Sequence, residues 1–124
     1  MLYKPFSKPY IGMTGVLTNN ISVLNIDFLL FFCVMIPMSV INDVGLLDES
    51  FNPGGFEDAD YCMRLRDKDY EFTSVAYSSE MRDGNAIVNM PMYHKAEVTV
   101  NTIKDWDSIF QGNYKKLLKK WGVQ

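Results

Sequence analysis

Three carboxylates lie close together where a helical segment is expected to begin. Glu57 and Asp58 are adjacent, Asp60 is two residues further on, and the flexible sequence Pro53-Gly54-Gly55 precedes them. Like charges repel one another, so such a cluster is expected where a ligand binds or a proton is transferred. One carboxylate could take the proton from a sugar hydroxyl as it attacks. Its neighbours could hold the other hydroxyl groups of the same molecule.

The same acids also have a purely structural interpretation. Asp and Glu are common at helix starts, where they cap free N–H groups and face the positive end of the helix dipole. Asp58 and Asp60 could equally form part of a metal site, although the glycine and terminal glutamate of a calcium loop are absent. The local pattern alone therefore leaves capping and ligand binding open.

A longer pattern around these acids favours the functional interpretation. In succession the chain carries Gly45-Leu-Leu-Asp-Glu-Ser-Phe51, Gly55-Phe-Glu-Asp-Ala-Asp-Tyr-Cys-Met-Arg-Leu-Arg66 and Lys68-Asp-Tyr70. This pattern resembles the inverting nucleotide-sugar glycosyltransferases of family 2, which have the A-type fold. The resemblance extends from about Gly15 to Thr102 and is most specific between residues 33 and 70.

The resemblance implies roles for the individual acids. Asp58 corresponds to the aspartate that usually acts as catalytic base. Glu57 and Asp60 would contact acceptor hydroxyls or orient that base. Arg64 matches a common family arginine, and we expect it to pair with an acid. Asp48 and Glu49 also match, and we expect them mainly to fix the loop and secondarily to line the acceptor cleft.

The only histidine of the chain is His94. A lone histidine is more often a structural hydrogen-bonding residue than a ligand. The resemblance, however, places His94 near the donor diphosphate, where it would help to hold Mg²⁺ or Mn²⁺. Hard cations prefer oxygen ligands, so His94 cannot form that site alone. Most ligands of the metal ion would belong to the nucleotide-binding half of such an enzyme.

The resemblance covers the acceptor side of such enzymes. Nucleotide-binding strand–helix units and an Asp-x-Asp would precede Gly15, where only residues 1–14 stand. We therefore expect an α/β, partial nucleotide-diphospho-sugar transferase (A-type) fold, a mixed sheet flanked by helices with the N-terminal nucleotide-binding half missing. Sheet edges left open by that loss predict a homo-oligomer or a complementary N-terminal chain.

The expected function follows from the same resemblance. It is transfer of a sugar, with inversion, from a nucleoside-diphosphate sugar to a glycan or other hydroxyl acceptor, with donor binding incomplete in the isolated chain. The alternative is a non-catalytic binding or assembly module, or a remnant, that retains the acidic acceptor cleft.

Composition sets broader limits. The 124 residues form one expected domain, 1–124, and 48% hydrophobic with 22% charged residues is ordinary for a globular protein. A net charge of −3 argues against nucleic-acid binding. Cys33 and Cys62 have no metal-site spacing, so free thiols are expected. No signal-peptide pattern begins the chain, which predicts a cytoplasmic protein.

Apolar patterns predict the elements around the acids. The predicted elements are a strand from Gly15, a strand at 28–36 of the kind covered on both faces, a short helix at 37–44, a helix at about 58–68 and a strand at 70–77. Without the nucleotide-binding half, the segment 28–36 is expected to lose cover on at least one side. An amphipathic helix is expected at 103–122, with its apolar residues at three- and four-residue steps. Its lysines predict a solvated basic face on a packed helix, with peripheral membrane contact as the alternative.

Overall fold

The computed structural model describes residues 11–17, 21–82, 85–88 and 99–123, and of residues 16, 75–82 and 85–88 it describes the backbone alone. His94, the residue predicted to help hold a metal ion, lies outside the described residues.

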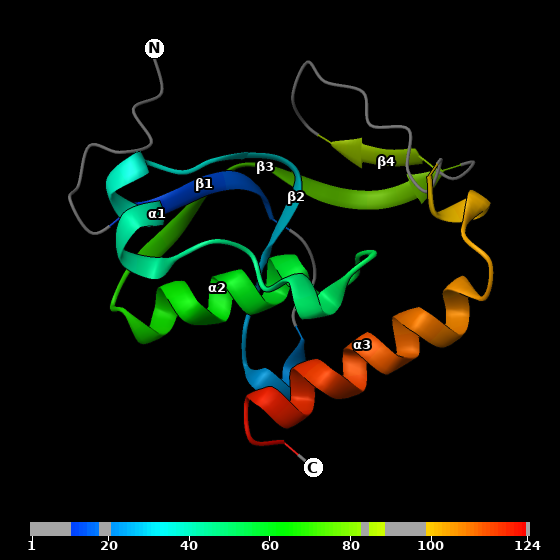
Figure 1. Cartoon of the computed structure of the whole chain (residues 1–124). Coiled ribbons are helices and arrows are strands. Elements are labelled where there is room, and N and C mark those ends of the chain that lie inside the picture. The colour runs from blue at the N-terminus through cyan, green and yellow to red at the C-terminus, as the bar shows by residue number, and fades with distance from the viewer. Residues whose placement is uncertain (1–10, 18–20, 83–84, 89–98, 124) are drawn as a thin grey trace.

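A mixed β-sheet forms the centre of the molecule (Figure 1). Its strand order is β2-β1-β3-β4, with β1 antiparallel to β2 and parallel to β3, and β4 antiparallel to β3. The strands are β1 (Ile11–Leu17), β2 (Leu29–Met35), β3 (Glu71–Arg82) and β4 (Asn85–Val88). The helices are α1 (Met38–Val44), α2 (Glu57–Asp67) and α3 (Trp106–Lys120), with 3₁₀ turns η1 (Ser22–Leu24), η2 (Glu49–Phe51) and η3 (Val100–Thr102). The predicted α/β class, with a mixed sheet flanked by helices, is confirmed, whereas the A-type assignment stays a prediction.

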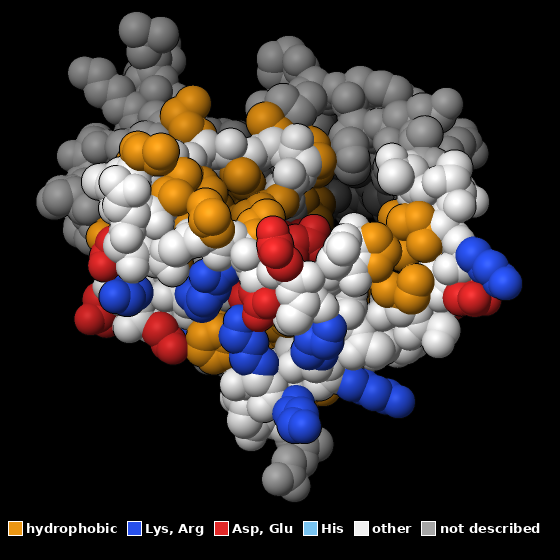
Figure 2. All heavy atoms as spheres, in the orientation of Figure 1, with side chains coloured by type: hydrophobic (Ala, Val, Ile, Leu, Met, Phe, Trp, Pro, Cys, Tyr) orange, Lys and Arg blue, Asp and Glu red, His pale blue; other side chains and the backbone are white. Residues whose placement is uncertain are grey.

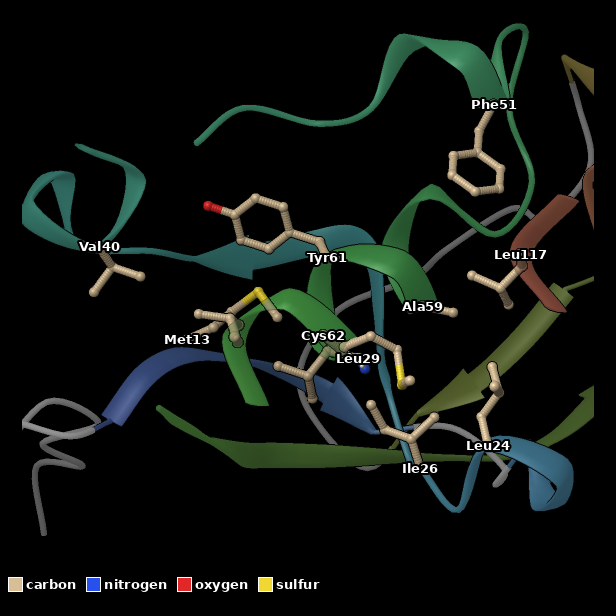
Figure 3. Packing of buried hydrophobic residues seen from close by; sticks show 12 residues of the cluster. Met13, Leu24, Ile26, Leu29, Val40, Phe51, Ala59, Tyr61, Cys62 and Leu117 are labelled. Atoms are coloured by element: carbon tan, nitrogen blue, oxygen red, sulfur yellow. Dashed lines mark hydrogen bonds between the residues drawn. The ribbon is translucent and has the colours of Figure 1, made fainter. Parts of the chain in front are cut away.

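Helix α2 packs directly on the sheet. Gly12 of β1 permits this close approach, because a Cβ there would lie 2.9 Å from the Leu65 side chain and 3.0 Å from Tyr70 Cβ. Figure 3 shows the resulting core, in which side chains of α2 meet those of the strands and of α3. The fully buried side chains include Met13, Leu29, Phe51, Tyr61, Cys62, Leu65 and Leu117. Both cysteines are free, as predicted, and burial raises the pKa of the Cys62 thiol to about 12.

The apolar segment 28–36 is a strand, as predicted, but it is not covered on both faces. Strand β2 stands at one end of the sheet order. Only Leu29 at its beginning is buried, the following residues are half-buried, and Met35 at its end is 60% exposed. The strand therefore lacks the cover on both faces that its continuous apolar pattern favours, and this agrees with the loss of cover on at least one side that the sequence predicts. A continuous apolar segment resembles a central strand, but here α2 covers it while its outer edge has no strand partner among the described residues.

The predicted helix boundaries agree closely with the structure. Pro37 precedes α1, and Gly45, with a φ of +97°, ends it. Helix α2 spans Glu57–Asp67, one residue from the predicted range at either end. Asp69, with a φ of +61°, adopts the left-handed conformation that the sequence allows for an aspartate after a helix.

Helix α3 lies within the predicted range 103–122 and packs on the loop that leads into α2 (Figure 1). The buried Asn113 side chain donates hydrogen bonds to the carbonyl oxygens of Phe51 (2.9 Å) and Gly54 (2.8 Å). Leu117, one turn later, is fully buried. The interpretation as a packed helix is confirmed, while membrane contact stays a prediction. Within the described segments, none of the helices combines the length and apolarity needed to cross a bilayer.

Removing the Asn113 amide tests this attachment. We expect Asn113→Ala to lower the free energy of unfolding by about 1 to 3 kcal/mol, because two loop carbonyls lose their donor in a buried place. Urea denaturation followed by circular dichroism measures the change. Gln111→Ala, at an exposed position of the same helix, is the control and should stay within about 0.5 kcal/mol. Equal effects of the two substitutions would contradict the proposed anchoring.

Candidate functional site

The acids stand at the end of a tightly constrained loop. Gly54 (φ +150°), Gly55 (φ +96°) and Phe56 (φ +73°) precede the first residue of α2. The Phe56 ring packs on α3, with its centroid 4.6 Å from that of Phe110. A Cβ on Gly55 would lie only 3.1 Å from the Phe110 ring. The glycines therefore let the loop pass close to α3 before the chain enters α2.

Asp60 lies at the centre of a buried ion-pair network. Its side chain has no exposed surface. One carboxylate oxygen accepts from the Trp121 indole (2.9 Å) and pairs with Lys120 Nζ (2.8 Å). The other accepts from Arg64 Nε at 3.1 Å, so Arg64 pairs with an acid, as expected. Asp60 thus satisfies both of its oxygens within the protein.

Lys120 extends this network to the loop before η2. It lies 2.8 Å from an oxygen of Asp48, whose other oxygen accepts from the Ser50 amide at 2.9 Å. The hydrogen bond from Lys120, with that from Ser50, lowers the pKa of Asp48 well below its usual range. Burial opposes the charge on Lys120, but its hydrogen bonds to Asp48 and Asp60 outweigh this and raise its pKa. Asp48 therefore fixes its loop, as predicted.

Asp58 differs from Asp60 in having no cationic partner among the described residues. It is half-buried, and one oxygen accepts from the Ala59 amide at 2.8 Å. Burial, with the neighbouring charge of Glu57, raises its pKa from 3.8 to about 7. Backbone amides of Ala59, Asp58 and Phe31 lower the pKa but do not outweigh burial. The group is therefore able to accept or release a proton near neutral pH.

Glu57 also has a carboxylate oxygen that is free to accept a hydrogen bond. Its Oε2 atom is buried and has no hydrogen-bond partner within the described structure. A buried oxygen in this state is uncommon and is explained by a ligand or an ordered water. Glu57 lines an open hollow of about 340 Å³, together with Leu47, Asp48, Glu49, Phe51 and Asn52. Its carboxylate can accept a hydrogen bond from a hydroxyl group placed in that hollow.

Side chains of α2 also hold the beginning of the loop whose later residues line this hollow. The Tyr61 hydroxyl donates to the Gly45 carbonyl at 2.9 Å, and Arg64 Nη1 donates to the Val44 carbonyl at 3.4 Å. Arg64 also stacks over the Tyr61 ring, 4.8 Å from its centroid. Helix α2 therefore carries Glu57 and Asp58 and also positions the loop that faces Glu57.

The predicted Mg²⁺ or Mn²⁺ ion was tested against these residues. Within the described residues no three His, Cys, Asp or Glu side chains are grouped closely enough to share a metal ion. Asp60 is fully engaged, which leaves Glu57 and Asp58 as neighbouring oxygen donors. These two residues do not form a metal site by themselves, so the metal ion stays a prediction.

The structure brings together residues that the sequence did not connect. Glu57 lines a hollow, and Asp58 lies in a desolvated environment, whereas the Asp60 side chain is fully buried. The spacing of Asp60 and Arg64 on one helix could have revealed their ion pair. Lys120 and Trp121 gave no such signal, because their contact with Asp60 depends entirely on tertiary packing.

Comparison with known proteins adds no relative: no protein-family model, curated protein or solved structure matches the chain.

Substitution of Asp60 and of Asp58 by asparagine should change the free energy of unfolding in opposite directions. In Asp60→Asn, Arg64, Lys120 and Trp121 lose a buried anion, and we expect a loss of about 3 kcal/mol of unfolding free energy. In Asp58→Asn, an unpaired partly buried charge disappears, and at pH 7 we expect a gain on the order of 1 kcal/mol or more. Urea denaturation of both variants at pH 7 measures these changes.

The pH dependence gives a second check on Asp58. The folded protein keeps the Asp58 proton up to about pH 7, whereas the unfolded chain releases it near 3.8. The stability contributed by protonated Asp58 is therefore lost as pH rises from about 4 to about 7. The advantage of Asp58→Asn over the wild type should grow across this window and vanish below it. An advantage independent of pH would contradict the raised pKa.

Proposed function

We propose that this chain supplies the acceptor side of an inverting glycosyltransferase, which transfers a sugar from a nucleoside-diphosphate sugar to a hydroxyl acceptor. The observation that carries the proposal is that neighbouring carboxylates on one helix differ in whether they are paired with cationic side chains. Asp60 is fully paired, whereas Glu57 and Asp58 have no cationic partner among the described residues. Their position in the sequence pattern that resembles family 2 glycosyltransferases supports the same function.

Asp58 is the proposed general base. A base is most effective when its pKa lies near the working pH, because it must be ionised and still hold a proton strongly. Burial brings the pKa of Asp58 to about 7, which meets this condition. As the acceptor oxygen bonds to the anomeric carbon, its proton passes to Asp58 and the nucleoside diphosphate leaves with the electron pair of the broken bond. Attack opposite the leaving group inverts the anomeric centre.

Glu57 and Asp60 have different proposed roles. Glu57 accepts a hydrogen bond from the acceptor through its unpartnered oxygen, which fixes the orientation of the attacking hydroxyl. Asp60 acts indirectly, because its two oxygens already bind Arg64, Lys120 and Trp121. It positions α2 and thereby the base. Of the two roles that the sequence left open for Asp60, we thus favour orientation over direct contact with the sugar.

Acceptor binding tests the role of Glu57. Titration of the ¹⁵N-labelled chain with methyl glycosides should shift amide signals near the start of α2. Glu57→Gln should weaken the binding about tenfold, since a hydrogen bond to a charged group is lost. Glu71→Gln removes an exposed acid elsewhere and should leave the affinity unchanged. Binding that is absent, or insensitive to Glu57→Gln, would contradict the proposed acceptor site.

Turnover tests the role of Asp58. With Mn²⁺, a nucleotide sugar and a bound methyl glycoside, release of nucleoside diphosphate should fall at least about 100-fold in Asp58→Asn, because the proton acceptor is lost. Calorimetry with nucleotide sugars shows separately whether donor binding occurs. Donor binding that appears only when a complementary N-terminal chain is added would indicate a divided enzyme. Glycoside binding without donor binding or turnover, with or without such a chain, would favour the non-catalytic binding module instead.

A further inference from the structure

A second, apolar hollow adjoins the acid-lined one. Its volume is about 250 Å³, and Leu47 lines both hollows. The apolar side chains around it are Phe31, Val34, Ile36, Ile41, Leu46 and Leu47. Tyr61 contributes its ring, while its hydroxyl is already bonded to the Gly45 carbonyl. The hollow therefore offers apolar contact and almost no hydrogen-bonding capacity.

The surface around this hollow is also apolar and exposed. Of the residues that line it, Leu46 is 78% exposed and Leu47 44%. Met35 and Met38, close in sequence to the lining residue Ile36, are 60% and 68% exposed. Figure 2 shows a cluster of hydrophobic side chains on this face with acidic side chains directly beside it. Grouped exposed apolar side chains of this kind mark binding surfaces more often than isolated ones do.

Asp58 lies near the junction of the two environments. Phe31 lines the apolar hollow, and its backbone amide is close enough to Asp58 to lower the pKa of that carboxyl. Glu57, the preceding residue, lines the polar hollow. A molecule that spans both hollows would thus place its polar end beside Glu57, the neighbour of Asp58, and its apolar end against Phe31 and Ile41.

Charge restricts the polar end of that molecule. Asp48, Glu49 and Glu57 line the polar hollow. Lys120 pairs with Asp48 but is shared with Asp60, and Lys116 lies over the ring of Phe51, which also lines the hollow. The three acids still outnumber these two lysines, which leaves a negative excess. An anionic headgroup such as a phosphate would be repelled there, whereas a neutral hydroxyl can donate to the carboxylates.

We propose that the acceptor is a neutral amphipathic alcohol, namely a glycoside or polyol that carries an aromatic ring or a branched alkyl group of similar size. This inference rests on the proposed function and adds the substrate class. A cavity of roughly 150 Å³ suffices for benzene, so the apolar hollow can hold one ring. The hydroxyl-bearing part then lies in the acid-lined hollow with one hydroxyl beside Asp58.

Equilibrium binding to three probes tests this inference by amide NMR titration. Phenyl β-glucoside should bind about tenfold more tightly than methyl β-glucoside, because the ring is buried. Phenyl phosphate should bind at least tenfold more weakly than phenyl β-glucoside. Leu46→Ser, at a residue that lines the apolar hollow alone, should weaken phenyl β-glucoside binding about fivefold and leave methyl β-glucoside binding unchanged. Val23→Ser removes another exposed apolar side chain, 54% exposed, and should change neither affinity.

The outcomes separate this inference from the proposed function. Equal affinity for the two glucosides, with binding still weakened by Glu57→Gln, overturns the inference and leaves the proposed function standing. If Glu57→Gln leaves the affinity for phenyl β-glucoside unchanged, both the inference and the proposed function are overturned. Tightest binding of phenyl phosphate also overturns the inference. Sedimentation of the wild type and Leu46→Ser tests the remaining alternative. Self-association that is lost in the variant, without discrimination between the two glucosides, assigns the apolar surface to a second copy of the chain and overturns the inference.

Discussion

The structure depends on one buried carboxylate, Asp60. It receives a guanidinium from its own helix and an ammonium and an indole from the end of α3. A buried charge is tolerated only when its partners are close and well oriented, and loss of a partner is costly. Asp60 therefore fixes α3 against α2, with the loop before α2 held between them. Residues about sixty positions apart in sequence thus determine where Glu57 and Asp58 stand.

This anchoring explains how the chain supports neighbouring acids with opposite properties. Arg64 and Lys120 together balance the charges of Asp48 and Asp60, so these two acids are stabilised by attraction. Glu57 and Asp58 receive no such compensation within the described structure, and burial, with their mutual repulsion, raises the pKa of Asp58 to about 7. Such a pair of acids destabilises the folded protein, but it can bind a ligand and accept a proton. This compromise between stability and activity is typical of functional sites.

Local signals in the sequence predicted the local structure well. Pro37 and Gly45 delimit α1, and Asp69 adopts a left-handed conformation after α2, because backbone geometry at these positions is set by the residue itself. Side-chain apolarity also predicted β2 as a strand, but it could not indicate that the strand stands at an end of the sheet. The sequence identified the acids as candidate site residues, but it did not indicate that Asp60 is paired with cations while Glu57 and Asp58, within the described structure, are not. Pairing with Lys120 and Trp121, and the adjoining apolar hollow, arise only when α2, α3 and β2 are assembled.

The central claim is that Asp58 is a proton acceptor poised near neutral pH and available to a ligand. The most direct measurement is its own titration, followed by ¹³C NMR of the carboxyl carbon in the intact chain, with Asp58→Asn used to assign the signal. The structure predicts an apparent pKa of about 7 that changes when a neutral glycoside is bound. A pKa that stays near the ordinary aspartate value of 3.8, with or without the glycoside, would contradict the account.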